Sequence, residues 1–174
     1  RILFDEHIFS LHIYEMEKVV DPDFINQNVS GLGVGKELFG QFYDLSAGGS
    51  TDFRSGNAAF HEMLITDDTK KILSKYDQTG YASDHLPNYT GAYSGADVMP
   101  LIRIPEMYYI MAEALLGEGD KERARDYLDA VVSARGMVKF ADRDVGKDIT
   151  LDDIMNERRK ELFGEGQWWF CLKR

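Results

Sequence analysis

The residues best suited to hold a small polar ligand lie between positions 77 and 97. There, tyrosines alternate with amide and carboxylate side chains. Sugar rings stack their C–H faces on flat aromatic side chains while amides and carboxylates bond the hydroxyl groups, so a saccharide site needs both kinds of residue. The alternative is that these tyrosines pack the stretch onto the remaining chain. We therefore predict a set of ligand-binding residues made of Tyr76, Tyr81, Asn88, Tyr89 and Tyr93.

The sequence contains few patterns that are typical of catalytic sites. The histidines are scattered without metal-ligand spacing, and neither G-x-S-x-G nor G-x-x-x-x-G-K-[ST] occurs. A second polar cluster of Asp52, Arg54 and Asn57 is interpreted as a turn rather than a site. We predict a protein that is not an enzyme and that has no catalytic residues, no metal site and no cofactor. A hydrolase with paired carboxylates stays open as an alternative, because a sequence does not give the distance between them.

Composition narrows the class of protein further. A chain of 174 residues fits one domain, and 44% hydrophobic with 29% charged residues is typical of a globular fold. The net charge of −10 repels phosphate backbones, so nucleic acid is not expected as a partner. The single cysteine, Cys171, forms no internal disulfide and is predicted to be a small buried residue, with Trp168 and Trp169 beside it in the core.

The elements that position these residues differ between the two parts of the chain. Residues 1–98 are rich in loops, with an alternating strand over 7–14, a short helix over 36–43, and strands over 60–65 and 72–76 that form a possible hairpin. Residues 77–97 form a long loop. The side chains expected to face inward are Phe9, Leu11 and Ile13 in the first strand and Leu38, Phe39 and Phe42 in the helix.

The remaining residues, 99–174, are predicted to be helical. Pro105 suits the first turn of a helix that ends near Gly117, a second helix runs from Lys121 to Arg135, and Thr150 caps a third. The fold class is thus mainly α with minor β-strands, in one domain over residues 1–174. The inward residues are predicted to be Met107, Tyr108, Met111, Ala112 and Leu115 in the first helix, and Ala124, Leu128, Val131 and Val132 in the second.

The first two of these helices match the tetratricopeptide spacing. Tyr108, Ala112 and Leu115 on one helix, then Ala124 and Leu128 on the next, fit the positions of that repeat. The alternative is that the same spacing belongs to an antiparallel helical hairpin that is not a tetratricopeptide repeat. One such unit cannot bury its face alone, and no second copy of the pattern occurs, so the hairpin packs on the rest of the chain or on sequence beyond it.

Two longer segments carry a more specific pattern. Residues 100–114, PLIRIPEMYYIMAEA, resemble the L-x-R-x-x-E-x-Y-L-x-x-A-E-A helix of the SusD/RagB family. Residues 156–166, NERRKELFGEG, with Trp169 and the final Leu-Lys-Arg, are similar to the E-R-R-x-E-L-x-x-E-G-x-R-W-x-D-L-x-R signature of the same family. Trp168 stands where the family usually has Arg and Cys171 where it usually has Asp, so no role is carried over to those positions.

The charged residues of both segments are interpreted as architecture. Arg158 and Glu161 are three residues apart and Glu161 and Glu165 four, so they share a helix face and can pair there or with the first segment. The resemblance implies that such charges hold the helical unit together. The predicted residues of structural ion pairs are Arg103, Glu106, Glu113, Arg158, Glu161 and Glu165.

The resemblance also implies a function and a location. It predicts the C-terminal portion of a nutrient-binding lipoprotein on the outer face of the bacterial outer membrane. Such a protein binds glycans or related nutrients and delivers them to a TonB-dependent SusC-like transporter. Both ends of the chain suggest a cut from a longer protein, so membrane contact would come only through a lipid anchor outside this sequence. The alternative is a helical-repeat scaffold that binds a protein or peptide partner.

Overall fold

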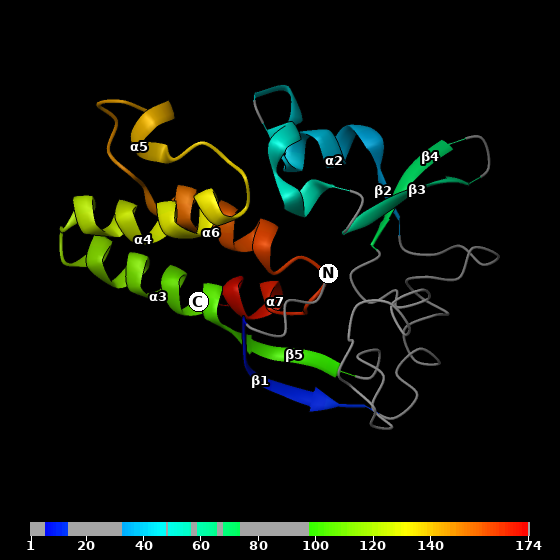
Figure 1. The fold of residues 1–174 in the computed structure, drawn as a ribbon, viewed down its shortest axis with the longest axis horizontal. Helices are drawn as coiled ribbons and strands as arrows, with labels where there is room; N and C mark the ends of the chain where they lie inside the picture. The colour runs from blue at the N-terminus through cyan, green and yellow to red at the C-terminus, as the bar shows by residue number, and fades with distance from the viewer. Residues whose placement is uncertain are drawn as a thin grey trace, which may run out of the picture.

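The structure is a computed structural model in which helices gather on one side and two small sheets lie beside them (Figure 1). It describes residues 6–13, 33–47, 49–56, 59–65, 68–73 and 98–173. The predicted mainly α fold is confirmed. No helix in these ranges combines the length and the apolar character that crossing a membrane requires.

The helical side is built on an antiparallel hairpin of α3 (Ile104–Gly117) and α4 (Lys121–Ala134). Pro105 lies in the first turn of α3, where its missing N–H costs no hydrogen bond. Gly119 takes a φ of +87°, which turns the chain, and the Asp120 side chain then accepts a hydrogen bond from the Arg123 amide at 3.1 Å to cap α4. The two helices lie side by side, as the spacing of their small residues predicted (Figure 1).

A third long helix completes this layer. The α6 helix (Leu151–Glu161) begins with a capping box, in which Thr150 and Asp153 bond each other's backbone amides. The short helix α5 (Phe140–Arg143) and the short helix α7 (Trp168–Cys171) precede and follow it. The buried residues that join these elements form one core cluster, made of Tyr109, Ala112, Leu115, Ala124, Leu128, Val131, Val132, Met137, Phe140, Ile149 and Ile154.

The other side contains two antiparallel sheets. The strands β1 (His7–His12) and β5 (Val98–Arg103) form a ribbon that leads directly into α3. The strands β2 (Gly33–Gly35), β4 (Asp68–Leu73) and β3 (Phe60–Ile65) form a three-stranded sheet in that order. The hairpin of β3 and β4 is therefore present, although β4 begins and ends earlier than the predicted strand over 72–76.

A second core joins this sheet to the helices. The α2 helix (Lys36–Phe42) places Phe39 against Tyr43 and Phe60, and Phe163 from beyond α6 packs on the same group. The close packing of Leu73 in β4 on the turn after α6 depends on Gly164. There φ is +78°, and an added Cβ would overlap the Leu73 side chain. Three short 3₁₀ turns at 45–47, 49–51 and 53–55 connect α2 to β3.

Several side chains predicted to face inward are exposed instead. In α3 Met107 and Met111 are 40% and 43% exposed, whereas the buried residues are Pro105, Glu106, Tyr109, Ala112 and Leu115. The prediction was right for Ala112 and Leu115 and wrong for the two methionines, because α3 is apolar on most of its sides and periodicity alone does not fix its inner face. The same correction applies to Tyr108 in α3, to Leu38 in α2 and to Trp169 in α7.

The first strand also departs from its prediction. Phe9 and Leu11 are 51% and 44% exposed, although their alternation suggested burial. The register of β1 against β5 shifts between His7 and Phe9 and again between Phe9 and Ser10. Such irregularities move successive side chains to the other face of a ribbon, which a strict period of two does not anticipate. The β1 strand therefore forms where it was predicted but presents apolar side chains to solvent. Its partner β5 is a correction, because residues from 99 on were predicted to be helical and the helix begins only at Ile104.

Candidate functional site

Charged residues buried between the two sides form the most prominent polar feature of the described chain. We define the buried ion network as Glu6, Asp52, Arg54, Arg103, Arg135, Glu157, Lys160, Glu161 and Glu165. Its members come from segments far apart in the sequence, which the packing of α6 brings together. Burying so many charges is tolerated only when each is paired and hydrogen-bonded.

Glu161, the last residue of α6, is the centre of this network. One oxygen, Oε1, lies 2.9 Å from Arg103 and 2.9 Å from Arg135. The other, Oε2, accepts a hydrogen bond from Arg135 Nε at 3.0 Å and lies 3.7 Å from Arg54. Burial opposes the charged form of Glu161, but the hydrogen bond from Arg135 and the charges of the arginines outweigh it and lower its pKa. The carboxylate stays ionised in the core.

Arg103 joins β5, and so the start of α3, to the end of α6. Its Nη2 donates to Glu165 Oε1 at 2.7 Å and to the Glu161 carbonyl at 2.9 Å. Glu6 lies 3.1 Å from Arg103 and 2.8 Å from Arg135, so it closes the cluster from the N-terminal side. Burial opposes the charge of Arg103, yet the carboxylates of Glu161 and Glu165 raise its pKa overall. Arg103 therefore joins β1, β5 and α6 into one unit.

Arg54 extends the network to the turns before β3. It bonds Asp52 at 2.7 Å and Glu157 at 2.6 Å, and all three side chains are buried. Lys160 pairs with Glu157 at 3.0 Å and with Asp44 at 2.8 Å on the same side of α6. The turn predicted from Asp52, Arg54 and Asn57 is present at Asp52 and Arg54, while Asn57 lies outside the described residues. The charges of this turn also tie it to α6. The sequence offered only the short spacing of these two residues as a signal.

Five of the six residues predicted for structural ion pairs fall into two groups. Arg103, Glu161 and Glu165 meet in the buried ion network, as described above. Arg158 instead pairs with Glu106 in the first turn of α3, at 2.8 Å. Glu113 is half-buried on α3. The prediction omitted Arg135 and Glu6, because nothing in their local sequence shows that they meet. It also omitted Glu157 and Lys160, although their spacing of three residues in one helix was a signal for that pair.

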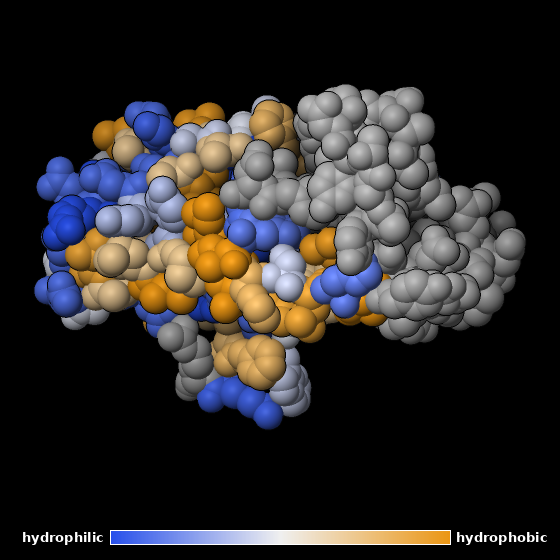
Figure 2. Space-filling model, turned by 60° about the horizontal axis from the view of Figure 1, so that its bottom comes forward, coloured by the Kyte–Doolittle hydropathy of each residue, from blue (hydrophilic) through white to orange (hydrophobic). Residues whose placement is uncertain are grey.

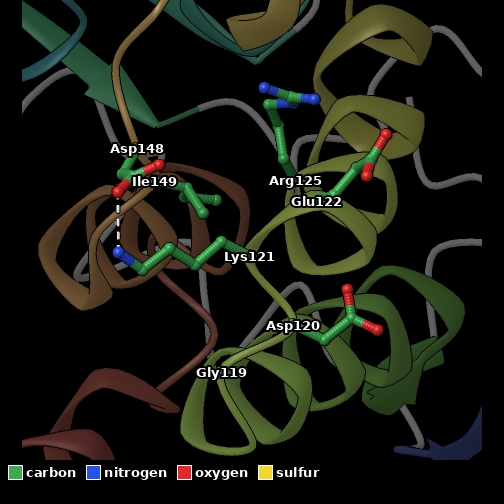
Figure 3. Close-up of a pocket in the computed structure, with 7 residues that line it drawn as sticks. All are labelled: Gly119, Asp120, Lys121, Glu122, Arg125, Asp148 and Ile149. Atoms are coloured by element: carbon green, nitrogen blue, oxygen red, sulfur yellow. Dashed lines mark hydrogen bonds and ion pairs between the residues drawn. The ribbon is translucent and has the colours of Figure 1, made fainter.

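A small polar pocket lies at the turn between α3 and α4, with a volume of about 440 Å³ (Figure 3). Lys121 and Asp148 form an ion pair of 2.6 Å across it. The lining carries charges of both signs but no aromatic ring on which a sugar could stack. The lining residues are Gly119, Asp120, Lys121, Glu122, Arg125, Asp148 and Ile149.

The predicted ligand-binding residues lie outside the described part of the chain. These are Tyr76, Tyr81, Asn88, Tyr89 and Tyr93. The flanking elements are described: β4 ends at Leu73 in the three-stranded sheet, and β5 begins at Val98 in the ribbon that leads to α3. Among the described residues, no group of three or more histidine, cysteine, aspartate or glutamate side chains has the arrangement of a metal site.

The helical hairpin, the helix α6 and the charges that join them define a mainly α module braced by buried ion pairs. The SusD family model matches residues 27–174, which is most of the chain, and the protein therefore belongs to the SusD family. No curated protein matches the chain.

A solved structure shares the fold. It is the crystal structure of a protein from Bacteroides vulgatus ATCC 8482 that is described as a candidate sugar binding protein. The two superpose with a TM-score of 0.59 at 21% sequence identity, and the match covers 92% of this chain but 32% of the other. At this identity the likeness shows the fold alone. The chain thus spans about a third of the length of that protein.

Proposed function

We propose that this protein captures a glycan or a related nutrient at the bacterial cell surface, without chemistry on the ligand. The observation that carries the proposal is the family match over residues 27–174. The description of the Bacteroides vulgatus protein as a candidate sugar binder agrees with it. Location on the outer membrane and delivery to a SusC-like TonB-dependent transporter are part of the same proposal, by analogy with the family.

The proposed binding surface is the tyrosine-rich segment between β4 and β5. Tyr81, Tyr89 and Tyr93 would offer flat rings, and Asn88 would bond hydroxyl groups. Support comes from how the segment is held. Leu73 on one side is buried in the second core, and Arg103 at the end of β5 is held by Glu161 and Glu165. Binding residues are often carried on loops that a rigid scaffold positions. We infer that the buried ion network serves ligand binding by holding Arg103 in place, while the second core holds Leu73.

Calorimetric titration with a panel of gluco-, manno- and xylo-oligosaccharides tests the proposal, with product analysis of the same mixtures. We expect binding without cleavage. Tyr81→Ala and Tyr89→Ala should each weaken binding about 3- to 10-fold, the value of one aromatic stacking contact. Trp169→Ala is the matched control, because Trp169 is an exposed aromatic residue outside the segment. Product formation would support a hydrolase, and no binding to any sugar would favour the scaffold alternative. Equal losses in all three variants would reject the tyrosine-rich segment as the binding surface.

A further inference from the structure

Charged side chains join the three-stranded sheet and its turns to the helix α6. We define the sheet unit as the described residues between 33 and 73, which form α2, the three-stranded sheet and the 3₁₀ turns beside α6 (Figure 1). Arg54 of this unit bonds Glu157 of α6 at 2.6 Å. Lys160 of α6 bonds Asp44 of the unit at 2.8 Å. We call this contact the charged joint.

The apolar contacts across the charged joint come from side chains that are only partly buried. Phe163, which follows α6, packs on Phe42 and Phe60 of the sheet unit. Met99 of β5 packs on the same core. The buried apolar residues divide instead between two separate clusters, one in the helices and one in the sheet unit. Figure 2 shows hydrophobic residues on the outer surface of the molecule, whereas the charges of the joint are buried.

A charged joint separates more easily than an apolar core. When the joint opens, water solvates Arg54 and Glu157, and this recovered solvation offsets much of the lost pairing. Opening an apolar core has no such compensation, because it exposes hydrophobic surface to water. The sheet unit spans residues 33–73, which is close to the length of roughly 40 residues below which a domain rarely folds alone. We therefore expect the unit to unfold once it leaves α6.

We propose that the sheet unit opens from α6 and unfolds as one cooperative unit while the helical hairpin and α6 stay folded. Partial openings of this kind have a smaller free energy than global unfolding and often follow supersecondary units. Leu73 belongs to the sheet unit, so the opening releases the end of β4. Arg103 at the end of β5 stays held by Glu161 and Glu165. Ligand binding between β4 and β5, as proposed above, would favour the closed state, but the opening itself does not depend on that function.

Native-state hydrogen exchange of the full chain in low concentrations of guanidinium chloride tests the proposal. Amides of β4 should exchange through an opening of smaller free energy than those of α4. That opening should also depend less steeply on denaturant, because it exposes only part of the surface that global unfolding exposes. If the amides of both helices and sheet exchange with one free energy and one denaturant dependence, the chain unfolds in a single step and the proposal is overturned.

Truncating the helical core separates the two units more sharply. Leu128 is fully buried in that core, so Leu128→Ala should speed exchange in α4 about 30-fold or more. The helical core is intact both before and after the sheet unit opens. Exchange in β4 should therefore stay within about 3-fold of the parent. Equal acceleration in β4 and α4 would show one cooperative structure and reject the sheet unit.

Arg54→Met tests the charged joint itself. The substitution removes the guanidinium that the buried carboxylates of Asp52 and Glu157 share in the closed state, whereas water solvates both carboxylates in the open state. Opening should become about 100-fold more frequent, measured as faster exchange in β4. Lys121→Met is the matched control, because it removes a cation from the exposed pair with Asp148 and should change exchange in β4 by less than about 3-fold. Unchanged exchange in β4 after Arg54→Met would show that these charges do not hold the unit in place, contrary to the proposal.

Discussion

Two ion pairs of this protein have similar distances between their charged atoms but lie in opposite surroundings. Glu161 and Arg103 are 2.9 Å apart with side chains 3% and 7% exposed, whereas Lys121 and Asp148 are 2.6 Å apart with side chains 52% and 72% exposed. The distance alone would rank the surface pair first. Solvent decides the energetics instead, because removing one partner of a buried pair leaves a charge without compensation, while water replaces a lost partner at the surface.

The largest effect is expected from neutralising the centre of the buried ion network. Glu161→Gln keeps the shape of the side chain but removes the buried carboxylate that Arg103 and Arg135 share, leaving them the partly exposed carboxylate of Glu6. We expect a loss of about 3–5 kcal/mol in the free energy of unfolding, measured by urea denaturation.

The matched control is Glu118→Gln, which removes one carboxylate from an exposed position. It should change the free energy of unfolding by less than about 0.5 kcal/mol. If the two substitutions cost the same, the arginines around position 161 are solvated or re-paired, and the contrast between buried and exposed pairs would not hold.

Lowering the pH should reduce the stability that the charge of Glu161 contributes to the folded protein. The pKa of Glu161 is lowered in the folded state, since its arginine partners outweigh the cost of burial. Its stabilising contribution is therefore complete above the unfolded pKa, about 4.3, and is lost as the pH falls below that value. Urea denaturation at several pH values between about 7 and 3 should show stability declining across the acid limb.

The Glu161→Gln variant sharpens the same measurement. It has no carboxyl group to titrate at position 161, so its stability should decline less steeply with acid than that of the parent. Parallel curves for the two proteins would show that other carboxylates carry the whole acid response, and that Glu161 is not the group whose charge matters most.

A smaller loss of stability is expected at the start of α6, where the exposed capping box involves only neighbouring residues. Thr150 Oγ1 accepts from the Asp153 amide at 3.3 Å, and Asp153 Oδ2 accepts from the Thr150 amide at 2.9 Å. Thr150→Ala removes one half of this capping box and should cost about 1 kcal/mol. Thermal unfolding measures it, with Thr150→Ser as the control that keeps the hydroxyl. Equal losses in both variants would assign the effect to the methyl group.

Sequence patterns predicted the parts of this molecule that depend on near neighbours. The capping residue Thr150, the stop of α4 before Gly136 and the inner face of α4 all follow from spacing within one helix. The buried face of α4 could be predicted from the sequence because charged residues occupy its exposed face. In α3 no such contrast exists, and Met107 and Met111 were assigned to the core when they are exposed.

The buried ion network illustrates what sequence could not provide. Arg103, Glu161 and Glu165 were predicted to pair because they lie in recognisable segments. Arg135 and Arg54 were not, since their partner Glu161 lies 26 positions away in one case and on a different side of the fold in the other. A buried arginine and an exposed one look alike in a sequence. Packing alone shows which arginines reach the same carboxylate.

The smallest effect is expected at the exposed pair of Lys121 and Asp148, which spans the pocket between the start of α4 and the start of α6. Lys121→Ala should change the free energy of unfolding by about 0.5 kcal/mol or less, because water solvates the carboxylate that remains. Raising the salt concentration to about 1 M should reduce even that difference, since salt screens exposed charges and hardly affects buried ones. The difference between Glu161→Gln and its parent should persist in the same salt. A salt-insensitive loss above about 2 kcal/mol for Lys121→Ala would mean that this pair also acts as a buried brace, and burial would then no longer distinguish the two regions.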